Sequence, residues 1–273
     1  MREVSISDFR KLYIPPKNSH KGQNGRLMII AGSKMYHGAS ILPLKVASRI
    51  VDLVYYSSIE ENNKIVERMK SELLDFIVIP RKKVVKFVDE CDSILIGPGL
   101  GENCFTKKMT ERLLKRYPEK RFVLDADSLK VLNPKFLGKN CLITPHKVEF
   151  QRLFGLPADE ERVCFMAKKF GCVILLKGPV DIICSPTDCA VNKTGNPGMT
   201  KGGTGDVLAG LVAALSCKND LFLAGCLGAF INGLAGDRLM KRFSYYYNAS
   251  DLVEEIPKTM MWLHQKTCRS KTK

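Results

Sequence analysis

The sequence predicts an α/β fold in which helices cover both faces of a mostly parallel central sheet. Three observations support this prediction. Short runs such as RLMIIAG at 26–32 and CVILLKG at 172–178 are apolar throughout, which is typical of strands buried on both faces. Amphipathic segments such as TKKMTERLLKRY at 106–117 alternate with these runs. Glycines, acids or a lysine follow several of the runs, at the edge where parallel sheets bind ligands.

Strands are predicted wherever a short apolar run is bounded by turn residues. Such runs occur at 26–32, 52–58, 76–80, 93–99, 121–127, 140–146 and 172–178. Two further runs, at 180–185 and 188–194, are expected to form a short antiparallel pair because only a tight turn separates them.

Helices are predicted where apolar residues recur about every 3.6 positions. These segments lie at 38–50, 106–117, about 158–170, 204–217, 220–241 and 250–266. Met109, Leu113 and Leu114 share one face of the second segment. Pro43 is expected in about the first turn of its helix, where the missing backbone donor costs least.

Length and composition indicate a single globular domain. The 273 residues are 45% hydrophobic and 26% charged, which is ordinary for a soluble chain with a buried core. We expect one domain over 1–273, with 1–20 as an N-terminal extension. The first residues lack the apolar core of a signal peptide, and the apolar run 221–236 is short for a membrane span and contains Asn232. A cytoplasmic location is therefore expected.

The formal net charge is +15. Such an excess is consistent with an anionic ligand, with a nucleic acid, or with a lysine-rich surface that has no specific partner. The longest basic runs, such as RKKVVK at 81–86, include apolar positions, and no basic stripe or aromatic platform is visible. A nucleic-acid-binding function thus rests on the net charge alone, and the cause of the excess stays open.

Ten cysteines are scattered along the chain without a C-x-x-C pair, which argues against a zinc ribbon and against a thioredoxin motif. Most of them lie inside apolar segments, as Cys172 and Cys226 do. They are expected to be small buried hydrophobic residues of a protein in a reducing compartment.

The stretch GNPGMTKGGTGDVLAG packs five glycines into the eleven residues from Gly195 and then becomes an apolar helix. It is not a Walker A loop, because Thr204 stands where that motif requires lysine. GPGLGE at 97–102 also fails the dinucleotide fingerprint, because Glu102 occupies its last glycine position. Neither common nucleotide motif explains the loop.

The composition of this loop nevertheless points to an anion. Gly202, Gly203 and Gly205 let the backbone approach a ligand closely, and the free amides of the following helix carry a partial positive charge. A negatively charged Asp206 would repel a phosphate, so its presence is unexpected if the loop only binds an anion. It is explained if Asp206 removes a proton from a hydroxyl that attacks that phosphate. The alternative is a plain glycine turn in which Asp206 is only an acid at a helix N-terminus.

GTGD at the start of an apolar helix resembles the ribokinase-like superfamily, and NPGMTKGGTGDVLAG is similar to its ADP/ATP-dependent NAD(P)H-hydrate dehydratases. Further matching blocks follow in family order: GQNGRLMIIAGSKMYHGASILPLKVASR, SILIGPGLG, VLDADSLKVL, LITPHKVEF, VILLKG and NASDLVEEIP. The resemblance covers residues 20–257 and implies a three-layer α/β/α sandwich. It also implies repair of NADHX and NADPHX: a nucleotide phosphorylates the ring hydroxyl of the hydrate, and loss of phosphate restores the double bond.

The resemblance assigns the substrate residues one by one. Asp206 matches the catalytic aspartate and should contact the hydrate. His146 matches a substrate-binding histidine, although a buried histidine satisfied at a strand end is the alternative. Ala39 lies where the first helix of the family meets the hydrate. Gly99 and Gly101 line the dinucleotide side, unless they only form a tight turn.

The residues that the resemblance assigns to the adenine nucleotide lie at a strand end and in the glycine-rich loop. They are Lys177, Gly178, Pro179, Val180, Asp181, Asn196, Gly202, Gly203, Thr204 and Gly205. Gly205 should meet the nucleotide phosphate, and Lys177 either neutralises phosphate or ends a strand in solvent. Glu149 stands where ribokinase-like enzymes carry an acid that organises Mg²⁺ through water. The implied co-substrate is ADP or ATP, with Mg²⁺.

Some positions depart from the family pattern or have two interpretations. Thr200 and Lys201 replace small residues, and Lys201 either contacts phosphate or points to solvent. Asp181 stands where a hydroxyl residue is common, which leaves the nucleotide contacts open. Asp125 and Asp127 close a strand, where either is also a suitable helix cap.

The resemblance implies partners as well. A homo-oligomer such as a tetramer is expected, and so is a separate NAD(P)HX epimerase, because the chain lacks the epimerase domain that many relatives carry. Neither a nucleic acid nor a membrane is expected as a partner. The competing function on the same scaffold is a kinase for a vitamin precursor, whose product would be a stable phosphorylated compound. The sequence does not decide between ADP and ATP, or between NADHX and NADPHX.

Overall fold

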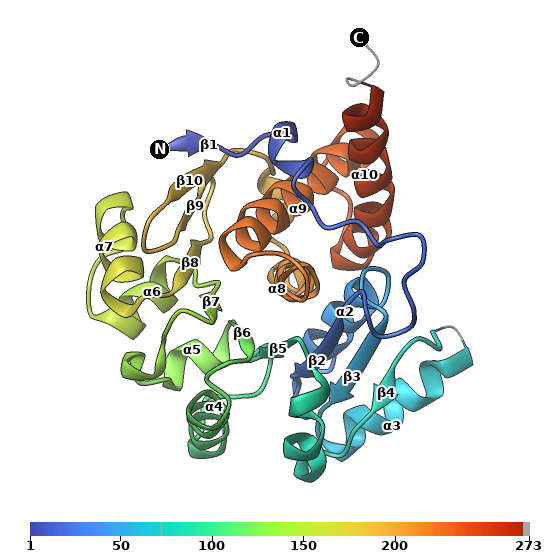
Figure 1. Ribbon diagram of the computed structural model, residues 1–273, viewed down its shortest axis with the longest axis vertical. Coiled ribbons are helices and arrows are strands. Elements are labelled where there is room, and N and C mark those ends of the chain that lie inside the picture. Colours follow the sequence, from blue (N-terminus) through green and yellow to red (C-terminus); the bar gives the residue numbers. More distant parts are fainter. Residues whose placement is uncertain (72, 270–273) are drawn as a thin grey trace.

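The structure is a computed structural model that describes residues 1–71 and 73–269. Within these ranges ten strands form one sheet: β1 (Arg2–Glu3), β2 (Arg26–Ile30), β3 (Leu53–Ser57), β4 (Ile77–Val78), β5 (Ser93–Ile96), β6 (Arg121–Leu124), β7 (Cys141–Ile143), β8 (Val173–Leu176), β9 (Asp181–Cys184) and β10 (Cys189–Asn192). The strand order is β1-β10-β9-β8-β7-β6-β5-β2-β3-β4 (Figure 1). β9 is antiparallel to both neighbours, and every other neighbouring pair is parallel. The predicted sheet and its antiparallel pair are confirmed.

Ten α-helices accompany the sheet in the described part of the chain: α1 (Ile6–Phe9), α2 (Gly38–Ala47), α3 (Glu60–Arg68), α4 (Cys104–Arg116), α5 (Asp127–Val131), α6 (Lys147–Phe154), α7 (Glu160–Phe170), α8 (Thr204–Ser216), α9 (Leu221–Phe243) and α10 (Ala249–Arg269). α2, α8, α9 and α10 lie on one side of the sheet, and α4 to α7 lie on the other (Figure 1). None of these described helices is long and apolar enough to cross a membrane.

The strands are apolar throughout because both of their faces are buried. Along β2, Leu27 and Ile29 belong to the core under α2, α8 and α9, whereas Met28 and Ile30 belong to the core under α4 to α7. All four side chains are fully buried. Successive side chains of a strand point to opposite faces, so one continuous apolar run supplies both cores.

The helix α3 was not expected from the sequence, because polar residues occupy its inner face. Asn62 and Asn63 are buried there. The side-chain amide of Asn62 donates to Ser58 Oγ at 2.8 Å, and Asn63 Oδ1 accepts from the Ser58 N–H at 3.1 Å. Hydrogen bonds replace apolar contacts on this face. The sequence therefore lacks the recurrence of apolar residues every 3.6 positions that predicts a helix.

The expectation that Pro43 lies near the first turn of its helix is wrong. It is the sixth residue of α2. The glycine Gly210 of α8 lies directly against it, and a Cβ on that glycine would stand 2.5 Å from the Cα of Pro43. Close backbone packing between α2 and α8 therefore outweighs the hydrogen bond that proline cannot donate, a loss of about 3 kcal/mol.

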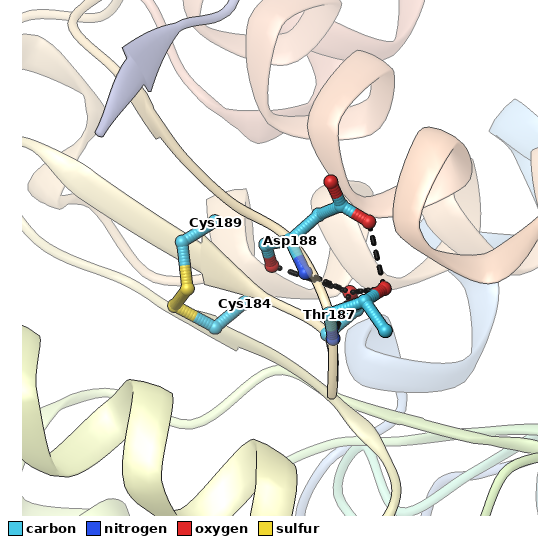
Figure 2. The surroundings of a disulfide bond; sticks show 5 residues. Cys184, Thr187, Asp188 and Cys189 are labelled. Carbon is cyan, nitrogen blue, oxygen red and sulfur yellow. Dashed lines mark hydrogen bonds between the residues drawn. A yellow bond between two sulfur atoms is a disulfide. The ribbon is translucent and has the colours of Figure 1, made fainter.

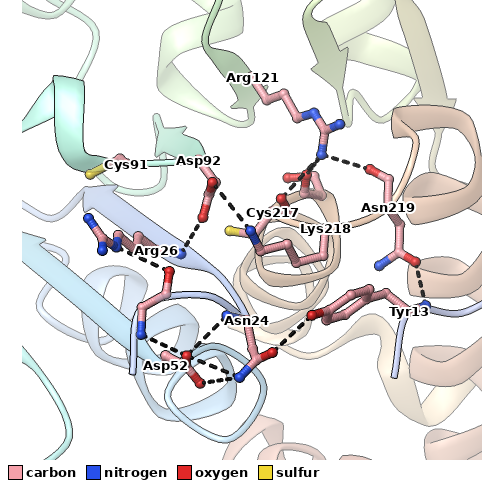
Figure 3. Close-up of polar contacts among 12 residues, drawn as sticks. Tyr13, Asn24, Arg26, Asp52, Cys91, Asp92, Arg121, Cys217, Lys218 and Asn219 are labelled. Carbon is pink, nitrogen blue, oxygen red and sulfur yellow. Dashed lines mark hydrogen bonds and ion pairs between the residues drawn. The ribbon is translucent and has the colours of Figure 1, made fainter. Parts of the chain in front are cut away.

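Polar contacts at the amino edge of the sheet hold the far end of α8 (Figure 3). Nη1 of Arg121 donates to the carbonyls of Ser216, Cys217 and Asn219 at 2.6, 3.2 and 3.1 Å. A cation at this end of a helix also opposes the negative pole of its dipole. The backbone N–H of Tyr13 donates to Asn219 Oδ1 at 2.8 Å, which joins the N-terminal segment to the same cluster.

The cysteines only partly match the expectation. Buried free thiols occur, as expected, at Cys91, Cys141, Cys172, Cys217 and Cys226. Burial raises the pKa of Cys141 to about 11, so this thiol stays protonated and packs as an apolar side chain. The expectation is wrong for the exposed Cys104, Cys164 and Cys268, and for the disulfide of Cys184 and Cys189 (Figure 2). The last two are opposite each other in the β9–β10 pair, with Cα atoms 4.2 Å apart.

Candidate active site

The parallel strands β2, β5, β6, β7 and β8 end at one edge of the sheet, called the carboxyl edge below. Small or polar residues follow within two positions of these strand ends: Gly32, Gly97, Asp125, Thr144 and Lys177. Gly97 has a φ of 134°, and a Cβ there would stand 1.8 Å from the carbonyl oxygen of Asp125. Only glycine lets β5 end this close to the neighbouring strand end.

An ion pair lies at the centre of the carboxyl edge. Lys177 Nζ donates to Asp125 Oδ1 at 2.8 Å, and Thr144 Oγ1 donates to the same oxygen at 2.7 Å. Burial by itself lowers the pKa of Lys177, but the carboxylates of Asp125 and Glu149 outweigh burial and hold that pKa above its ordinary value. Lys177 is therefore a fixed cation.

The glycine-rich loop ends at Gly203, which is the N-cap of α8 and has a φ of 93°. Glycine has no side chain with which to cap the helix. The hydroxyl of Thr204 donates to the carbonyls of Met199 and Lys201 at 2.6 and 2.9 Å, which holds the loop in place. The Thr204 N–H donates to the Lys201 carbonyl at 3.4 Å. The N–H groups of Gly205 and Asp206 are left for a ligand, together with the positive pole of the helix dipole.

Asp206 is the third residue of α8. Burial raises its pKa to about 7, and the negative charge of Asp125 adds to this rise against the opposing charge of Lys177. A carboxylate with this pKa can accept a proton near neutral pH. Lys177 Nζ would lie 3.7 Å from a Cβ on Gly205. A cation therefore lies beside the turn of α8 that carries the free amides and the base.

His146 and Glu149 form a capping box at the start of α6. His146 Nδ1 accepts from the Glu149 N–H at 3.2 Å, and Glu149 Oε2 accepts from the His146 N–H at 3.0 Å. The His146 side chain is 49% exposed, so it is not the buried, fully satisfied histidine of the alternative interpretation. Because Nδ1 is an acceptor, the neutral ring carries its proton on Nε2.

Ala39 and the loop that carries Gly99 and Gly101 lie together. A Cβ on Gly99 would stand 2.7 Å from the Cβ of Ala39, so the loop after β5 lies directly on the start of α2. The Gly101 N–H donates to Asp127 Oδ2 at 2.8 Å. The charge of Asp127 also raises the pKa of Asp206.

A cavity of about 640 Å³ opens beside the glycine-rich loop. Of the residues that the sequence singled out, it is lined by His146, Lys177, Gly178, Pro179, Asp181, Asn196, Thr200, Thr204 and Gly205. Val180, Gly202 and Gly203 belong to the same segments but do not line it, and neither do Ala39, Gly99, Gly101, Glu149 and Asp206. Asp206 is adjacent in sequence to Gly205, which lines the cavity.

Asn232 lines this cavity and was not singled out as a site residue. It is 5% exposed, and its Oδ1 is a buried acceptor without a hydrogen-bond partner in the described structure. A buried polar atom of this kind is costly unless a ligand satisfies it. The available signal was a single amide inside the apolar run 221–236. The other lining residues are Thr194, Gly195, Pro197, Met199, Leu208, Ala229 and Gly233.

Lys201 is an exposed residue that does not line the cavity, but its ammonium is engaged by backbone carbonyls rather than free in solvent. Its ammonium donates to the carbonyl of Tyr247 at 2.6 Å and to that of Tyr245, and lies 5.1 Å from the Tyr247 ring centroid. The Tyr247 hydroxyl donates to Asn196 Oδ1 at 2.7 Å. Lys201 therefore joins the loop to the segment before α10 and lies one contact away from a cavity residue.

Asp181 is held by its own hairpin. Its Oδ1 accepts from the Gly178 N–H at 3.0 Å, and its Oδ2 accepts from Asn192 Nδ2 at 3.0 Å. Burial raises the pKa of Asp181 even though these donors lower it. The carboxylate thus orders the segment 177–181 on one wall of the cavity.

The sequence matches a family model described as NAD(P)H-hydrate dehydratase over residues 27–258. The bifunctional NAD(P)H-hydrate repair enzyme Nnr of Methanocaldococcus jannaschii is 40% identical over 274 residues, which are 94% of this chain and 52% of the relative. The ADP-dependent (S)-NAD(P)H-hydrate dehydratase of Nitrosopumilus maritimus is 38% identical, over 95% of this chain and 97% of the relative. The chain spans about half the length of several curated relatives that it matches.

Solved structures agree with these matches. The ADP/ATP-dependent NAD(P)H-hydrate dehydratase of Bacillus subtilis, co-crystallized with ATP/Mg²⁺, has a TM-score of 0.83 at 25% identity and covers 96% of this chain and 98% of its own. A ribokinase-like superfamily protein of Enterococcus faecalis has a TM-score of 0.82 at 24% identity, with 96% of each chain covered. The predicted ribokinase-like fold is confirmed.

Proposed function

The chain belongs to the NAD(P)H-hydrate dehydratase family, and from this membership we propose that it dehydrates (S)-NADHX or (S)-NADPHX to NADH or NADPH, with ADP or ATP as co-substrate. The observation that carries the proposal is Asp206, with a pKa of about 7, in the first turn of a glycine-capped helix beside the cation Lys177. A base, an anion site and a fixed cation are the parts that phosphoryl transfer to a hydroxyl requires.

In the proposed first step, Asp206 accepts the proton of the ring hydroxyl while the hydroxyl oxygen attacks the terminal phosphorus of the nucleotide. The bond from that phosphorus to the nucleotide breaks, and the nucleotide leaves with one phosphate fewer. The amides of the first turn of α8 and the Lys177 ammonium stabilise the charge on the phosphoryl group, and each such donor contributes about 3 kcal/mol. The ring then expels phosphate and loses a proton from the neighbouring carbon, which restores the double bond.

The cavity beside the loop suits an adenine nucleotide. Lys177 and Gly205 line the cavity and lie close together, which suits the phosphates. Asn232 Oδ1, a buried acceptor without a partner in the described residues, also lines the cavity and suits the amino group of adenine. The hydrate would lie on the other side of Asp206, against Ala39, Gly99 and Gly101, and within reach of His146.

The chemistry of the donor set fits Mg²⁺. The negative charges of Asp125, Glu149 and Asp206 all raise the pKa of Lys177. Carboxylate oxygens are ligands that Mg²⁺ prefers. Asp125 Oδ1 and Glu149 Oε2 already accept hydrogen bonds, so Asp125 and Glu149 would hold the ion through water. When bound, Mg²⁺ neutralises charge on the nucleotide phosphates.

The direct test incubates the protein with hydrated NADH and with either ADP or ATP and Mg²⁺. We expect the absorbance of NADH to return and inorganic phosphate to accumulate in equal amount. The matched control is Glu67→Gln, which neutralises an exposed acid on α3 and should behave as the wild type. Absence of recovery with both nucleotides refutes the proposal. A stable phosphorylated product formed when a vitamin precursor replaces the hydrate would identify the competing kinase.

Three further features belong to the same proposal. We propose a homo-oligomer, which is supported by exposed apolar side chains such as Tyr246, Tyr245 and Met261 at 89%, 50% and 59% exposure. Light scattering tests it. We also propose a cytoplasmic location and a functional partnership with an NAD(P)HX epimerase. Adding such an epimerase to the assay should extend recovery from the S epimer to both epimers.

A further inference from the structure

Three cysteines gather away from the proposed active site, where α7 meets the turn between β9 and β10. Cys164 is exposed on α7, Cys184 is buried in β9, and Cys189 is half-buried in β10. Their sulfur atoms all lie within 4.8 Å of one another. In this structure Cys184 and Cys189 form a disulfide (Figure 2). The sulfur of Cys164 lies within 4.8 Å of both of its sulfurs.

We propose that these three cysteines, once the disulfide is reduced, bind one thiophilic d¹⁰ cation, Zn²⁺ or Cu⁺. Thiolate sulfur is the ligand that such cations prefer. With metal–sulfur bonds of about 2.3 Å, the sulfurs of a tetrahedral site are roughly 3.8 Å apart. The observed limit of 4.8 Å is close enough for side-chain rotation to close the site. The exposed side of Cys164 leaves a fourth position for water.

The backbone keeps two of the ligands together without the disulfide. Cys184 and Cys189 are direct partners in the β9–β10 register, with Cα atoms 4.2 Å apart. The turn between them has its own hydrogen bonds (Figure 2): Ser185 N–H donates to the Asp188 carbonyl at 2.7 Å. Ser185 Oγ also accepts from the N–H groups of Thr187 and Asp188 at 3.2 and 2.8 Å. Reduction therefore leaves both thiols adjacent.

A dithiol reductant opens the site by thiol–disulfide exchange. Its two sulfurs become a disulfide, and Cys184 and Cys189 become thiols. A divalent cation then displaces three thiol protons and forms three metal–sulfur bonds, which gives a complex with a net charge of −1. In the oxidised protein only the thiol of Cys164 remains, so the site is closed.

The site is independent of the proposed function. Asp181 and Asn192, which line or support the cavity, are paired at the other end of the same hairpin. Three register steps separate that pair from Cys184 and Cys189, a distance of roughly 10 Å along the strands. The dehydratase assay and the cation titration can therefore succeed or fail separately.

The test uses the full chain in a Cys104→Ser, Cys268→Ser background, which removes the other two exposed thiols. The protein is reduced with a dithiol, desalted without oxygen and titrated with Cd²⁺, Zn²⁺ or Cu⁺. Cd²⁺ is followed by its sulfur charge-transfer band, and the other two by competition with a chromophoric chelator. We expect saturation at one equivalent in the reduced protein and no charge-transfer band in the oxidised protein.

Adding Cys164→Ser should weaken binding at least about tenfold, because one of three ligands is lost. This residue is exposed, so circular dichroism should show an unchanged fold. Equal binding by the oxidised and reduced proteins overturns the proposal. So does binding by the Cys164→Ser variant with the affinity of its parent, or the absence of one-equivalent saturation for all three cations.

Discussion

The ammonium of Lys177, at the end of β8, lies 2.8 Å from the carboxylate of Asp125, at the end of β6. Asp125 is 2% exposed, so water does little to weaken this pair. The negative charge of Asp125 offsets much of the electrostatic effect of the Lys177 ammonium on Asp206. Asp206 therefore experiences burial and neighbouring acids more strongly than it experiences Lys177, and its pKa is raised to about 7.

Replacing Asp206 by asparagine should remove the base and keep the loop. We expect turnover to fall by about 10²-fold or more, while nucleotide affinity changes little, because the amides and Lys177 are retained. Steady-state kinetics and equilibrium nucleotide binding measure the two effects. Unchanged turnover would remove Asp206 from the role of base.

The activity of the wild type should depend on pH through Asp206. The carboxylate is the active form, so kcat/KM should fall about tenfold for each pH unit below a pKa of about 7, and level off above it. The profile of kcat/KM between pH 5 and pH 9 tests this. A limb that still bends near 7 in the Asp206→Asn variant would assign the titration to another group.

The buried carboxylate of Asp206 should lower the free energy of unfolding at neutral and alkaline pH. A pKa raised in the folded state means that ionisation opposes folding: the penalty is absent below the unfolded pKa of about 3.9 and complete above about 7. We expect Asp206→Asn to be more stable than the wild type at pH 8, by on the order of 1–3 kcal/mol, with the difference vanishing towards pH 4. Denaturant unfolding at both pH values measures it. A destabilised variant at pH 8 contradicts the raised pKa.

Asn232→Leu should weaken nucleotide binding without harming the fold. Its Oδ1 is buried without a partner in the described structure, so removing it should leave stability unchanged or raise it by about 1 kcal/mol. Losing the acceptor should weaken nucleotide affinity about tenfold. Leu208→Met, which alters the same cavity but no polar atom, is the matched control. Calorimetric titration with the nucleotide decides; equal affinities for Asn232→Leu and the control exclude the contact.

Lys201→Met should loosen the glycine-rich loop. The variant keeps the length of the side chain but loses its bonds to the carbonyls of Tyr245 and Tyr247. We expect the ordered conformation of the loop to lose about 1 kcal/mol of free energy relative to its disordered conformations. The KM for nucleotide should rise roughly fivefold, and kcat should change less. Lys64→Met, at an exposed position on α3, should change neither. A normal KM in Lys201→Met shows that the loop is ordered without this lysine.

The sheet could be predicted from the sequence because its strands are apolar on both faces, as β2 shows with Leu27, Met28, Ile29 and Ile30. The helix α3 could not be predicted, because Asn62 and Asn63 take the inner positions and hydrogen bonds do the work of apolar contacts. Pro43 was misplaced for a related reason. The free-energy cost of proline inside a helix depends on the local backbone and can be read from the sequence. The close packing of Gly210 of α8 against Pro43 depends on the tertiary structure and cannot.

By itself, the sequence determined that a glycine-rich loop precedes an apolar helix and that Asp206 lies in its first turn. These features depend on neighbouring residues and on backbone freedom, which a chain carries wherever it folds. Only the tertiary structure decided that Asp206 has a raised pKa, that Lys201 is bound to Tyr247, and that Asn232 has an unsatisfied acceptor in a cavity. Burial and charge act through space, and the groups responsible come from strands and helices far apart in the sequence.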